Sequence, residues 1–368
     1  MRTSNRIAFV IGGLRIGGAE KVCISLANKF HEEGYDISLI VLNLKNAELL
    51  KYLNPDVPII DLNLSHARMA FFPLYRNLNK FNITKCLSFN FQLSVLLVLI
   101  KKVFNIQISI YSRGISTYSE KILKEQNLRH KYFNSFLIRL LYRKSDFFIA
   151  QSTGMLKDMI EYLNVPKDKV RVIFNPVQSL QTTAEIRINE EVQTREILFV
   201  GTLKEAKNVS FLLRSIYELL RTREDFKFRI IGDGNLRSFL EQECRELGME
   251  NYVLFEGRRV NPERFYLNAD VFILGSWYEG FPNVLLEALS YGVPVVSIDC
   301  KSGPEDIIIE GSNGYLVKDY DEKDFAEKIC LALNREWNKE AIQASISKFN
   351  FEEIFREYRE YINHESKN

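Results

Sequence analysis

Short apolar runs alternate with segments of helical periodicity along most of the chain. The run 6–11 predicts a buried strand, 17–34 predicts a helix with its apolar residues on one face, and 37–42 predicts the next strand. A strand, a glycine-rich turn, a helix and a second strand form a βαβ unit, whose strands are parallel. Later strands of the same half are predicted at 106–110, 147–150 and 170–174.

A second alternation of the same kind begins at Glu196. Strands are predicted at 196–200, 226–231, 252–255, 269–274 and 295–298, with helices over roughly 209–221 and 236–247 between them. The polar stretch 177–195 has little periodicity and is the expected linker, whereas 349–361 has the pattern of an amphipathic helix. Because 368 residues exceed one ordinary core, we expect an α/β protein with two doubly wound domains, 1–180 and 190–348.

The most informative polar pattern runs from Glu279 to Glu287. It follows the apolar run 269–274, contains Gly280 and Pro282, and continues into a predicted helix. In an open parallel sheet, ligands bind at the carboxyl ends of the strands. Proline suits the first turn of a helix, whose free N–H groups favour an anion such as a diphosphate. Since carboxylates accept hydrogen bonds from sugar hydroxyls, the segment predicts a sugar-nucleotide site, with two ordinary surface glutamates as the alternative.

The composition, with 46% hydrophobic and 26% charged residues, is that of a soluble globular protein. The formal net charge is only +2, but residues 101–150 carry ten Lys/Arg and three Asp/Glu, a local balance of +7, with aromatic and leucine residues between them. This basic segment predicts a surface for anionic lipid headgroups or for a lipid-linked diphosphate. A well-solvated helix face is the alternative interpretation.

Cysteine spacing and the start of the chain bear on location. No pair of the five cysteines has metal-site or redox spacing, which is typical of small core residues in a reducing compartment. The chain enters its first strand almost at once, with no signal-peptide pattern. The longest apolar run, 93–100, is too short to span a bilayer. We therefore expect a cytoplasmic protein, peripheral on the inner face of the cell membrane.

Five motifs, in order, carry a resemblance to a known family. They are Gly17-Gly18-Ala19-Glu20; Phe199-Val200-Gly201 followed by Lys207-Asn208; Ile231-Gly232-Asp233-Gly234 with Phe255-Glu256-Gly257-Arg258; Glu279 through Glu287; and Ser302-Gly303-Pro304-Glu305. In this order the chain resembles the retaining glycosyltransferases of the GT-B fold, glycosyltransferase family four. The resemblance implies two Rossmann-like domains facing across a cleft: an N-terminal acceptor-binding domain and a C-terminal domain that binds the sugar nucleotide. It also implies that the C-terminal helix, 349–363, packs back on the first domain.

The resemblance assigns roles to matching residues. Glu279 would contact hydroxyls of the donor sugar beside the anomeric centre, Glu287 would hold the ribose hydroxyls, and Lys207 would neutralise the departing diphosphate. Glu279 and Lys207 are thus the expected catalytic residues. The remaining expected donor-binding positions are Gly17, Gly18, Gly201, Thr202, Arg258, Phe281, Pro282, Asn283 and Val284.

One position departs from the family's pattern. The residue after the glycine of the phosphate-binding turn is usually arginine, and here it is Thr202. Lys204 or Arg113 would have to supply the missing cation. Arg113, which follows the strand predicted at 106–110, is also the expected acceptor-side or sugar-side residue, with an ordinary surface arginine as the alternative.

We expect no cofactor and no metal. The single Asp-x-Asp match, Asp319-Tyr320-Asp321, lies in a polar stretch and is interpreted as a surface turn. A lysine and a helix N-terminus can carry the charge of a leaving diphosphate instead.

These observations predict a metal-independent retaining glycosyltransferase. It would move a hexosyl or N-acetylhexosaminyl group from a UDP-sugar to a growing lipid-linked glycan in surface polysaccharide biosynthesis. The expected partners are the nucleotide-diphosphate sugar, a glycan or lipid-diphosphate acceptor and an anionic membrane, and not nucleic acid. A non-hydrolysing sugar-nucleotide epimerase and a non-catalytic sugar-nucleotide-binding partner remain the alternatives.

Overall fold

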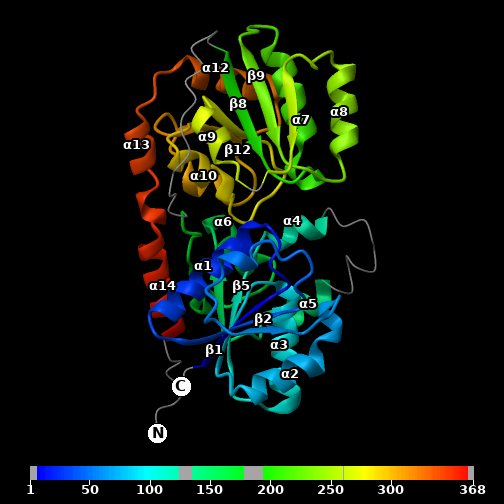
Figure 1. Ribbon diagram of the computed structural model, residues 1–368, viewed down its shortest axis with the longest axis vertical. Coiled ribbons are helices and arrows are strands. Elements are labelled where there is room, and N and C mark those ends of the chain that lie inside the picture. The colour runs from blue at the N-terminus through cyan, green and yellow to red at the C-terminus, as the bar shows by residue number, and fades with distance from the viewer. Residues whose placement is uncertain (1–5, 124–134, 178–193, 260, 364–368) are drawn as a thin grey trace. The chain divides into compact units, whose positions relative to one another are not determined.

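A computed structural model describes residues 6–123, 135–177, 194–259 and 261–363 of the chain. The chain divides into two compact units: unit 1 comprises residues 1–176 and 352–368, and unit 2 comprises residues 177–351 (Figure 1). Most of the linker expected at 177–195 lies outside the described residues. Each unit is a parallel sheet with helices connecting its strands, and each is described in turn.

Unit 1 is built around a parallel sheet of order β3-β2-β1-β4-β5-β6-β7. Its strands are β1 (Arg6–Ile11), β2 (Asp36–Val41), β3 (Ile59–Asp61), β4 (Lys85–Ser88), β5 (Ser109–Arg113), β6 (Phe147–Ala150) and β7 (Val170–Val172). Its helices are α1 (Gly18–Glu32), η1 (Leu50–Tyr52), η2 (Ala67–Met69), α2 (Phe71–Lys80), α3 (Phe91–Phe104), α4 (Tyr118–Leu123), α5 (Ser135–Tyr142), α6 (Thr153–Glu161), η4 (Lys167–Lys169) and α14 (Phe351–Asn363).

The C-terminal helix α14 packs on unit 1, as the resemblance implied. Its apolar face buries Ile354, Phe355, Tyr358 and Ile362. Phe355 makes an edge contact with Phe30 of α1, with ring centroids 4.9 Å apart. The backbone carbonyl of Ile362 accepts hydrogen bonds from two side chains of the sheet, Lys85 Nζ on β4 and Tyr111 OH on β5. These contacts satisfy polar groups that would otherwise be costly to bury.

Unit 2 repeats the architecture with a parallel sheet of order β10-β9-β8-β11-β12-β13. Its strands are β8 (Arg195–Val200), β9 (Phe226–Ile231), β10 (Val253–Gly257), β11 (Val271–Leu274), β12 (Val295–Ile298) and β13 (Gly314–Val317). Its helices are η5 (Glu205–Lys207), α7 (Val209–Leu219), α8 (Arg237–Glu246), α9 (Glu263–Asn268), α10 (Asn283–Ser290), α11 (Pro304–Ile307), α12 (Glu322–Asn334), α13 (Lys339–Ala344) and η6 (Ser347–Phe349).

The strand orders place a topological switch point in each unit. In unit 2, β8 pairs with β9 on one side and with β11 on the other, so the connections after β8 and after β11 run in opposite directions from this point. Ligands of doubly wound sheets bind outside the carboxyl ends of the strands at such a point. A ligand site in unit 2 is therefore expected at the loops after β8 and β11.

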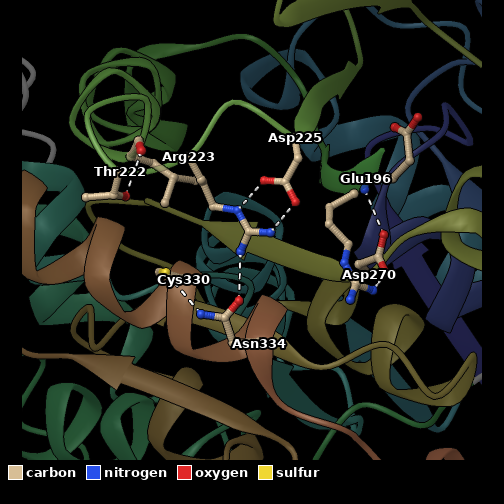
Figure 2. A network of polar contacts seen from close by, with 9 residues as sticks. Glu196, Thr222, Arg223, Asp225, Asp270, Cys330 and Asn334 are labelled. Carbon is tan, nitrogen blue, oxygen red and sulfur yellow. Dashed lines mark hydrogen bonds and ion pairs between the residues drawn. The ribbon is translucent and has the colours of Figure 1, made fainter. Parts of the chain in front are cut away.

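The opposite, amino ends of the unit 2 strands carry a structural network of polar contacts (Figure 2). Asp270, which precedes β11, accepts hydrogen bonds from the Glu196 backbone N–H and the Arg195 guanidinium. Arg223 forms two hydrogen bonds with Asp225, just before β9, and one with Asn334 of α12. These contacts join the amino ends of neighbouring strands to each other and to α12.

One predicted strand is wrong in its position. The alternating residues 106–110 predict a strand there, but β5 spans Ser109–Arg113, so Arg113 ends the strand instead of lying beyond it. Its neighbours in the sheet fix this register, because Ser112 pairs with Ser88 of β4 and with Phe148 of β6. Within the described residues, no helix is both long and apolar enough to cross a membrane.

Candidate active site

Lys207 and Glu279 meet at the switch point of unit 2. Lys207 ends η5, in the connection after β8, and Glu279 lies in the loop after β11. Lys207 Nζ is 2.5 Å from Glu279 Oε1, and the two side chains are only 16% and 13% exposed. Partial burial strengthens this ion pair because solvent screens it less than a surface pair. The structure thus brings together the two residues that the sequence proposed as catalytic.

Glycines allow the backbone around Lys207 to pack closely. The turn after β8 runs from Gly201 through Thr202, and the turn after β9 contains Gly232 and Gly234. A Cβ atom added to Gly232, whose φ is +155°, would lie 1.8 Å from the Gly201 carbonyl oxygen, and one on Gly234 would lie 2.2 Å from that of Leu203. The glycine motif therefore serves close contact between two loops, a structural reason that stands beside any role in binding.

Further contacts orient Glu279. Ser276 Oγ donates a 2.7 Å hydrogen bond to the same Oε1 atom that Lys207 contacts. Tyr320 OH donates to the Ser276 backbone carbonyl at 2.9 Å, and the Trp277 N–H donates to the Ala206 carbonyl at 2.9 Å. The second of these bonds ties the Glu279 loop to the residue before Lys207. The carboxylate is therefore held in place before any substrate arrives.

The Ser302-Gly303 loop supports the Glu279 loop from the next strand, β12. Ser302, with φ of +93°, donates from Oγ to the Gly280 carbonyl at 2.9 Å. Gly303 has φ of +104°, and a Cβ atom there would lie 2.4 Å from Pro282 Cδ. Both positive φ values lie where residues with side chains are rare. The motif after the paired glutamates is thus a backbone support for the segment that contains them.

Glu287 lies in α10 and is hydrogen-bonded to a buried tyrosine. Tyr266 of α9 donates from its OH to Glu287 Oε2 at 3.0 Å. The Tyr266 ring is 1% exposed and stacks on Tyr291, with centroids 5.4 Å apart and an angle of 7°. Burial, and then the neighbouring carboxylate, raise the pKa of Tyr266 well above its ordinary value. The phenol therefore remains a hydrogen-bond donor that fixes the orientation of Glu287.

The other expected donor-binding residues of this loop lie at the start of α10 and just before it. The sequence placed Pro282 in the first turn of a helix, but Pro282 is the residue that caps α10; Asn283 and Val284 begin the helix. Phe281 is 6% exposed and contacts Phe349 edge-on. Its side chain belongs to the core of unit 2, so any ligand contact from Phe281 would come from its backbone.

Three expected positions lie on exposed turns of unit 2. Thr202, Lys204 and Arg258 are exposed in the turns after β8 and β10. The Lys204 N–H donates to the Thr202 carbonyl at 2.9 Å, which places the lysine beside the position where the family usually has arginine. The donor-binding roles of these three residues stay predictions.

In unit 1, Gly17 and Gly18 form the start of α1, as expected. Gly17 caps the helix with an extended backbone, and a Cβ atom there would collide with the Glu20 carboxylate. Burial raises the pKa of Glu20, while the Arg113 charge acts in the opposite direction. With a larger residue at position 17, the Glu20 carboxylate would have to move away from the helix start.

Arg113 is not a surface residue, so that alternative is wrong. Its side chain is fully buried, with Nε donating to Tyr358 OH at 2.9 Å and one terminal nitrogen donating to Asn175 Oδ1 at 2.6 Å. Asn175 in turn donates to Gln151, which donates to the Gly114 carbonyl. The guanidinium is held by α14 and by the segment before residue 177. Its acceptor-side role stays a prediction.

Sequence patterns did not reveal Ser276, Tyr266 or Tyr320. Ser276 could have been suspected from its place three residues before Glu279 in the same loop. Tyr266 precedes Glu287 by 21 residues and Tyr320 follows Ser276 by 44, so only the fold brings these pairs together.

The Asp-x-Asp match is placed at a helix start. Asp319 and Asp321 are exposed, and Asp321 caps α12 by accepting hydrogen bonds from the N–H groups of Lys323 and Asp324. In the part of the chain that the structure describes, no group of three or more His, Cys, Asp or Glu side chains is arranged to hold a metal ion.

Two family models together match most of the chain. The model described as Glycosyltransferase Family 4 matches residues 16–179, and the model described as Glycosyl transferases group 1 matches residues 181–348. The boundary between them lies close to the division between the two units.

Two proteins of Campylobacter jejuni are among the similar sequences. One, named GalNAc-alpha-(1->4)-GalNAc-alpha-(1->3)-diNAcBac-PP-undecaprenol alpha-1,4-N-acetyl-D-galactosaminyltransferase, is 30% identical over 335 residues, which are 90% of this chain and 89% of that protein. The other, named N-acetylgalactosamine-N,N'-diacetylbacillosaminyl-diphospho-undecaprenol 4-alpha-N-acetylgalactosaminyltransferase, is 32% identical over 197 residues. That second match spans 54% of this chain and 53% of its relative, about half of each.

A solved structure shows the same fold. The Anabaena protein HepE, crystallised with UDP, has a TM-score of 0.78 and 17% sequence identity, and the match covers 96% of this chain and 98% of HepE. The GT-B fold expected from the sequence is thereby confirmed.

Proposed function

Because the chain belongs to glycosyltransferase family 4, we propose that it is a retaining transferase that takes a hexosyl or N-acetylhexosaminyl group from a UDP-sugar. The observation that carries this proposal is the meeting of Lys207 and Glu279 at the switch point of unit 2. A sugar nucleotide presents a diphosphate, which suits the Lys207 cation, and sugar hydroxyls, which suit the Glu279 carboxylate.

The charges of the site suit the transition state of glycosyl transfer. As the bond between the sugar and the diphosphate breaks, positive charge grows on the sugar ring and negative charge grows on the leaving diphosphate. Lys207 supplies a cation for the leaving group, and Glu279 supplies a carboxylate for the sugar side. Both groups are held in position before reaction, so little reorganisation accompanies charge development. We propose that this arrangement works without a metal.

The ion pair has a consequence for donor binding. Lys207 and Glu279 contact each other in the structure, so a donor that engages both must exchange this contact for contacts with itself. The tie between Trp277 and Ala206 keeps the two loops together during that exchange. Glu287, oriented by Tyr266, would take the ribose hydroxyls from the adjacent helix.

The acceptor proposal rests on the relatives. The two C. jejuni proteins carry names that describe transfer onto glycans linked through diphosphate to undecaprenol. We propose an acceptor of the same chemical class, a glycan on a lipid diphosphate, in surface polysaccharide synthesis. An enzyme with such an acceptor would work as a peripheral protein on the inner face of the cell membrane. The support for UDP as the nucleotide is its presence in the HepE crystal.

The experiment starts with a panel of sugar nucleotides. A donor at a hundred times its dissociation constant should stabilise the protein by about 2.7 kcal/mol in a thermal-shift measurement. The donor found in this way is then incubated with a lipid-linked acceptor glycan, and the product's anomeric configuration is determined by NMR. Transfer with the donor's configuration preserved supports the proposal, and inversion overturns the retaining assignment.

The same experiments distinguish the two alternative functions from glycosyl transfer. Conversion of UDP-GlcNAc to its epimer without any acceptor would identify an epimerase. Nucleotide binding with no transfer to any acceptor of the panel would favour a non-catalytic partner protein, for which Thr202 in place of the usual arginine is the supporting feature.

A further inference from the structure

A surface of unit 1 formed by η2, α2 and the end of α3 exposes large apolar side chains. Met69, Phe72 and Val103 are 53%, 61% and 63% exposed. The centroid of the Phe72 ring on α2 lies 6.3 Å from that of the Phe104 ring at the end of α3. The two helices lie side by side in Figure 1. Apolar side chains that are exposed together commonly mark an interaction site.

The elements that carry these apolar side chains also expose basic residues, and acidic residues are missing from the same segment of the sequence. Arg68, Arg76, Lys80 and Lys102 are exposed. From residue 62 through residue 119 the sequence contains no Asp and no Glu. We call Arg68, Met69, Phe72, Arg76, Lys80, Lys102 and Val103 the α2 surface.

The packing of α2 determines which of its faces is exposed. Leu74 and Leu78 are buried, and Tyr75 stacks on Phe104 with centroids 3.7 Å apart. Phe72, Arg76 and Lys80 follow each other at four-residue spacing and so share one face of the helix. Phe72 and the two bases therefore point away from the core on the same side.

We propose that the α2 surface docks on the headgroup region of a bilayer that contains anionic lipids. The apolar side chains would enter the interface, and the bases would meet lipid phosphates, the combination typical of interfacial helices. An acidic protein would also attract the bases. However, specific protein interfaces usually pair both signs of charge over a shaped area, whereas this segment offers a single sign and exposed apolar tips.

Apart from Lys102 and Val103, this location lies outside the membrane surface that the sequence suggested at 101–150. Within that segment Arg113 is buried, Lys101 is paired with Asp146 at 2.8 Å, and Arg139 lies over the Tyr162 ring at 4.9 Å. Lys124, Arg129 and Lys131 lie outside the described residues, and the side chain of Lys121 is not described. Arg143 and Lys144 are exposed and serve as the matched control.

The experiment measures flotation of the full chain with vesicles. Vesicles of phosphatidylcholine alone are compared with vesicles containing phosphatidylglycerol. We expect the wild type to bind only the anionic vesicles, and less at about 1 M salt, where the screening length falls to about 3 Å. Arg76→Glu with Lys102→Glu should weaken binding more than tenfold, since each basic group contributes about fivefold. Phe72→Ser should weaken it by about tenfold.

Two controls and a second readout complete the test. Phe239→Ser removes a 57% exposed phenylalanine of α8, and Arg143→Glu with Lys144→Glu reverses two exposed charges elsewhere; both should float like the wild type. All variants should keep the wild-type melting temperature and the thermal shift with UDP, so failure of the donor site would be seen separately. The proposal would be overturned if the α2 variants floated like the wild type, or if the Arg143 and Lys144 variant lost flotation. It would also be overturned if the wild type did not bind anionic vesicles, and that result would favour an acidic protein partner.

Discussion

At the scale of single residues, the Lys207–Glu279 pair gives the sharpest prediction. Glu279→Gln keeps the shape of the side chain but removes its charge, so a preorganised electrostatic contact is lost and kcat should fall by about a hundredfold or more. Lys207→Ala should raise the dissociation constant of UDP as well as lower kcat, because we propose that its cation faces the diphosphate both before and during the reaction. Glu340→Ala, an exposed glutamate of α13, is the control. Wild-type kcat in Glu279→Gln would refute the catalytic assignment.

Tyr266 allows a finer test at the same scale. Tyr266→Phe keeps the buried ring but removes the 3.0 Å hydrogen bond to Glu287. A hydrogen bond to a charged group contributes about 1.5–3 kcal/mol, so KM for the donor should rise by roughly tenfold while kcat changes little. Tyr291→Phe is a matched control, because the Tyr291 OH is buried without a hydrogen-bond partner among the described residues. Equal effects of the two variants would mean that the tyrosines matter only for packing.

At the scale of elements, the loop after β12 should control the loop after β11. Gly303→Ala puts a Cβ atom 2.4 Å from Pro282 Cδ at a φ of +104°. Either the backbone at residue 303 or the loop after β11 must therefore move. Strain of this kind costs about 1–3 kcal/mol, and thermal unfolding should show the loss of stability together with weaker UDP binding. Gly311→Ala has a similar positive φ of +71° but nothing closer than the end of the Arg335 side chain at 3.6 Å. It should lose stability without losing UDP affinity.

The elements also show how far the sequence alone could lead. Strands 147–150 and 226–231 were predicted to the residue, because turn residues bound a continuous apolar run in the first case and an alternating apolar pattern in the second. The strand ending at Arg113 was misplaced, since its polar residues are buried by partners that lie far away in the chain. Arg113 bonds Asn175, 62 residues on, and Tyr358, 245 residues on. In the site, short motifs identified Glu279 and Lys207, but Tyr266 required the fold.

At the scale of the whole molecule, the proposed absence of a metal can be tested on the intact enzyme. If Lys207 carries the charge that a divalent cation would otherwise balance, transfer in excess EDTA should equal transfer in its absence. Adding Mg²⁺ or Mn²⁺ back should change the rate by less than about twofold, a difference worth under 0.5 kcal/mol of barrier. Complete loss in EDTA that is restored by a cation would contradict the proposal and direct attention to Asp319 and Asp321.

The chain passes from unit 1 to unit 2 after Pro176 and returns after Phe351, and Arg113 contacts a residue near each crossing. Asn175 lies just before the first crossing, and Tyr358 lies in α14 after the second. Arg113→Met fills similar space but leaves both partners without their charged donor, at a cost of about 1.5–3 kcal/mol for each hydrogen bond. We therefore expect a clear loss of stability in denaturant unfolding, attributable to unit 1.

Donor binding should respond differently, because all expected donor-binding residues except Gly17 and Gly18 belong to unit 2. The dissociation constant of UDP for Arg113→Met should therefore stay within about threefold of the wild-type value, a change of less than about 0.7 kcal/mol. Arg143→Met, which removes an exposed arginine of unit 1, should leave stability and binding unchanged. If instead Arg113→Met lost UDP affinity as strongly as Lys207→Ala while its stability stayed near that of the wild type, Arg113 would supply the cation that Thr202 does not.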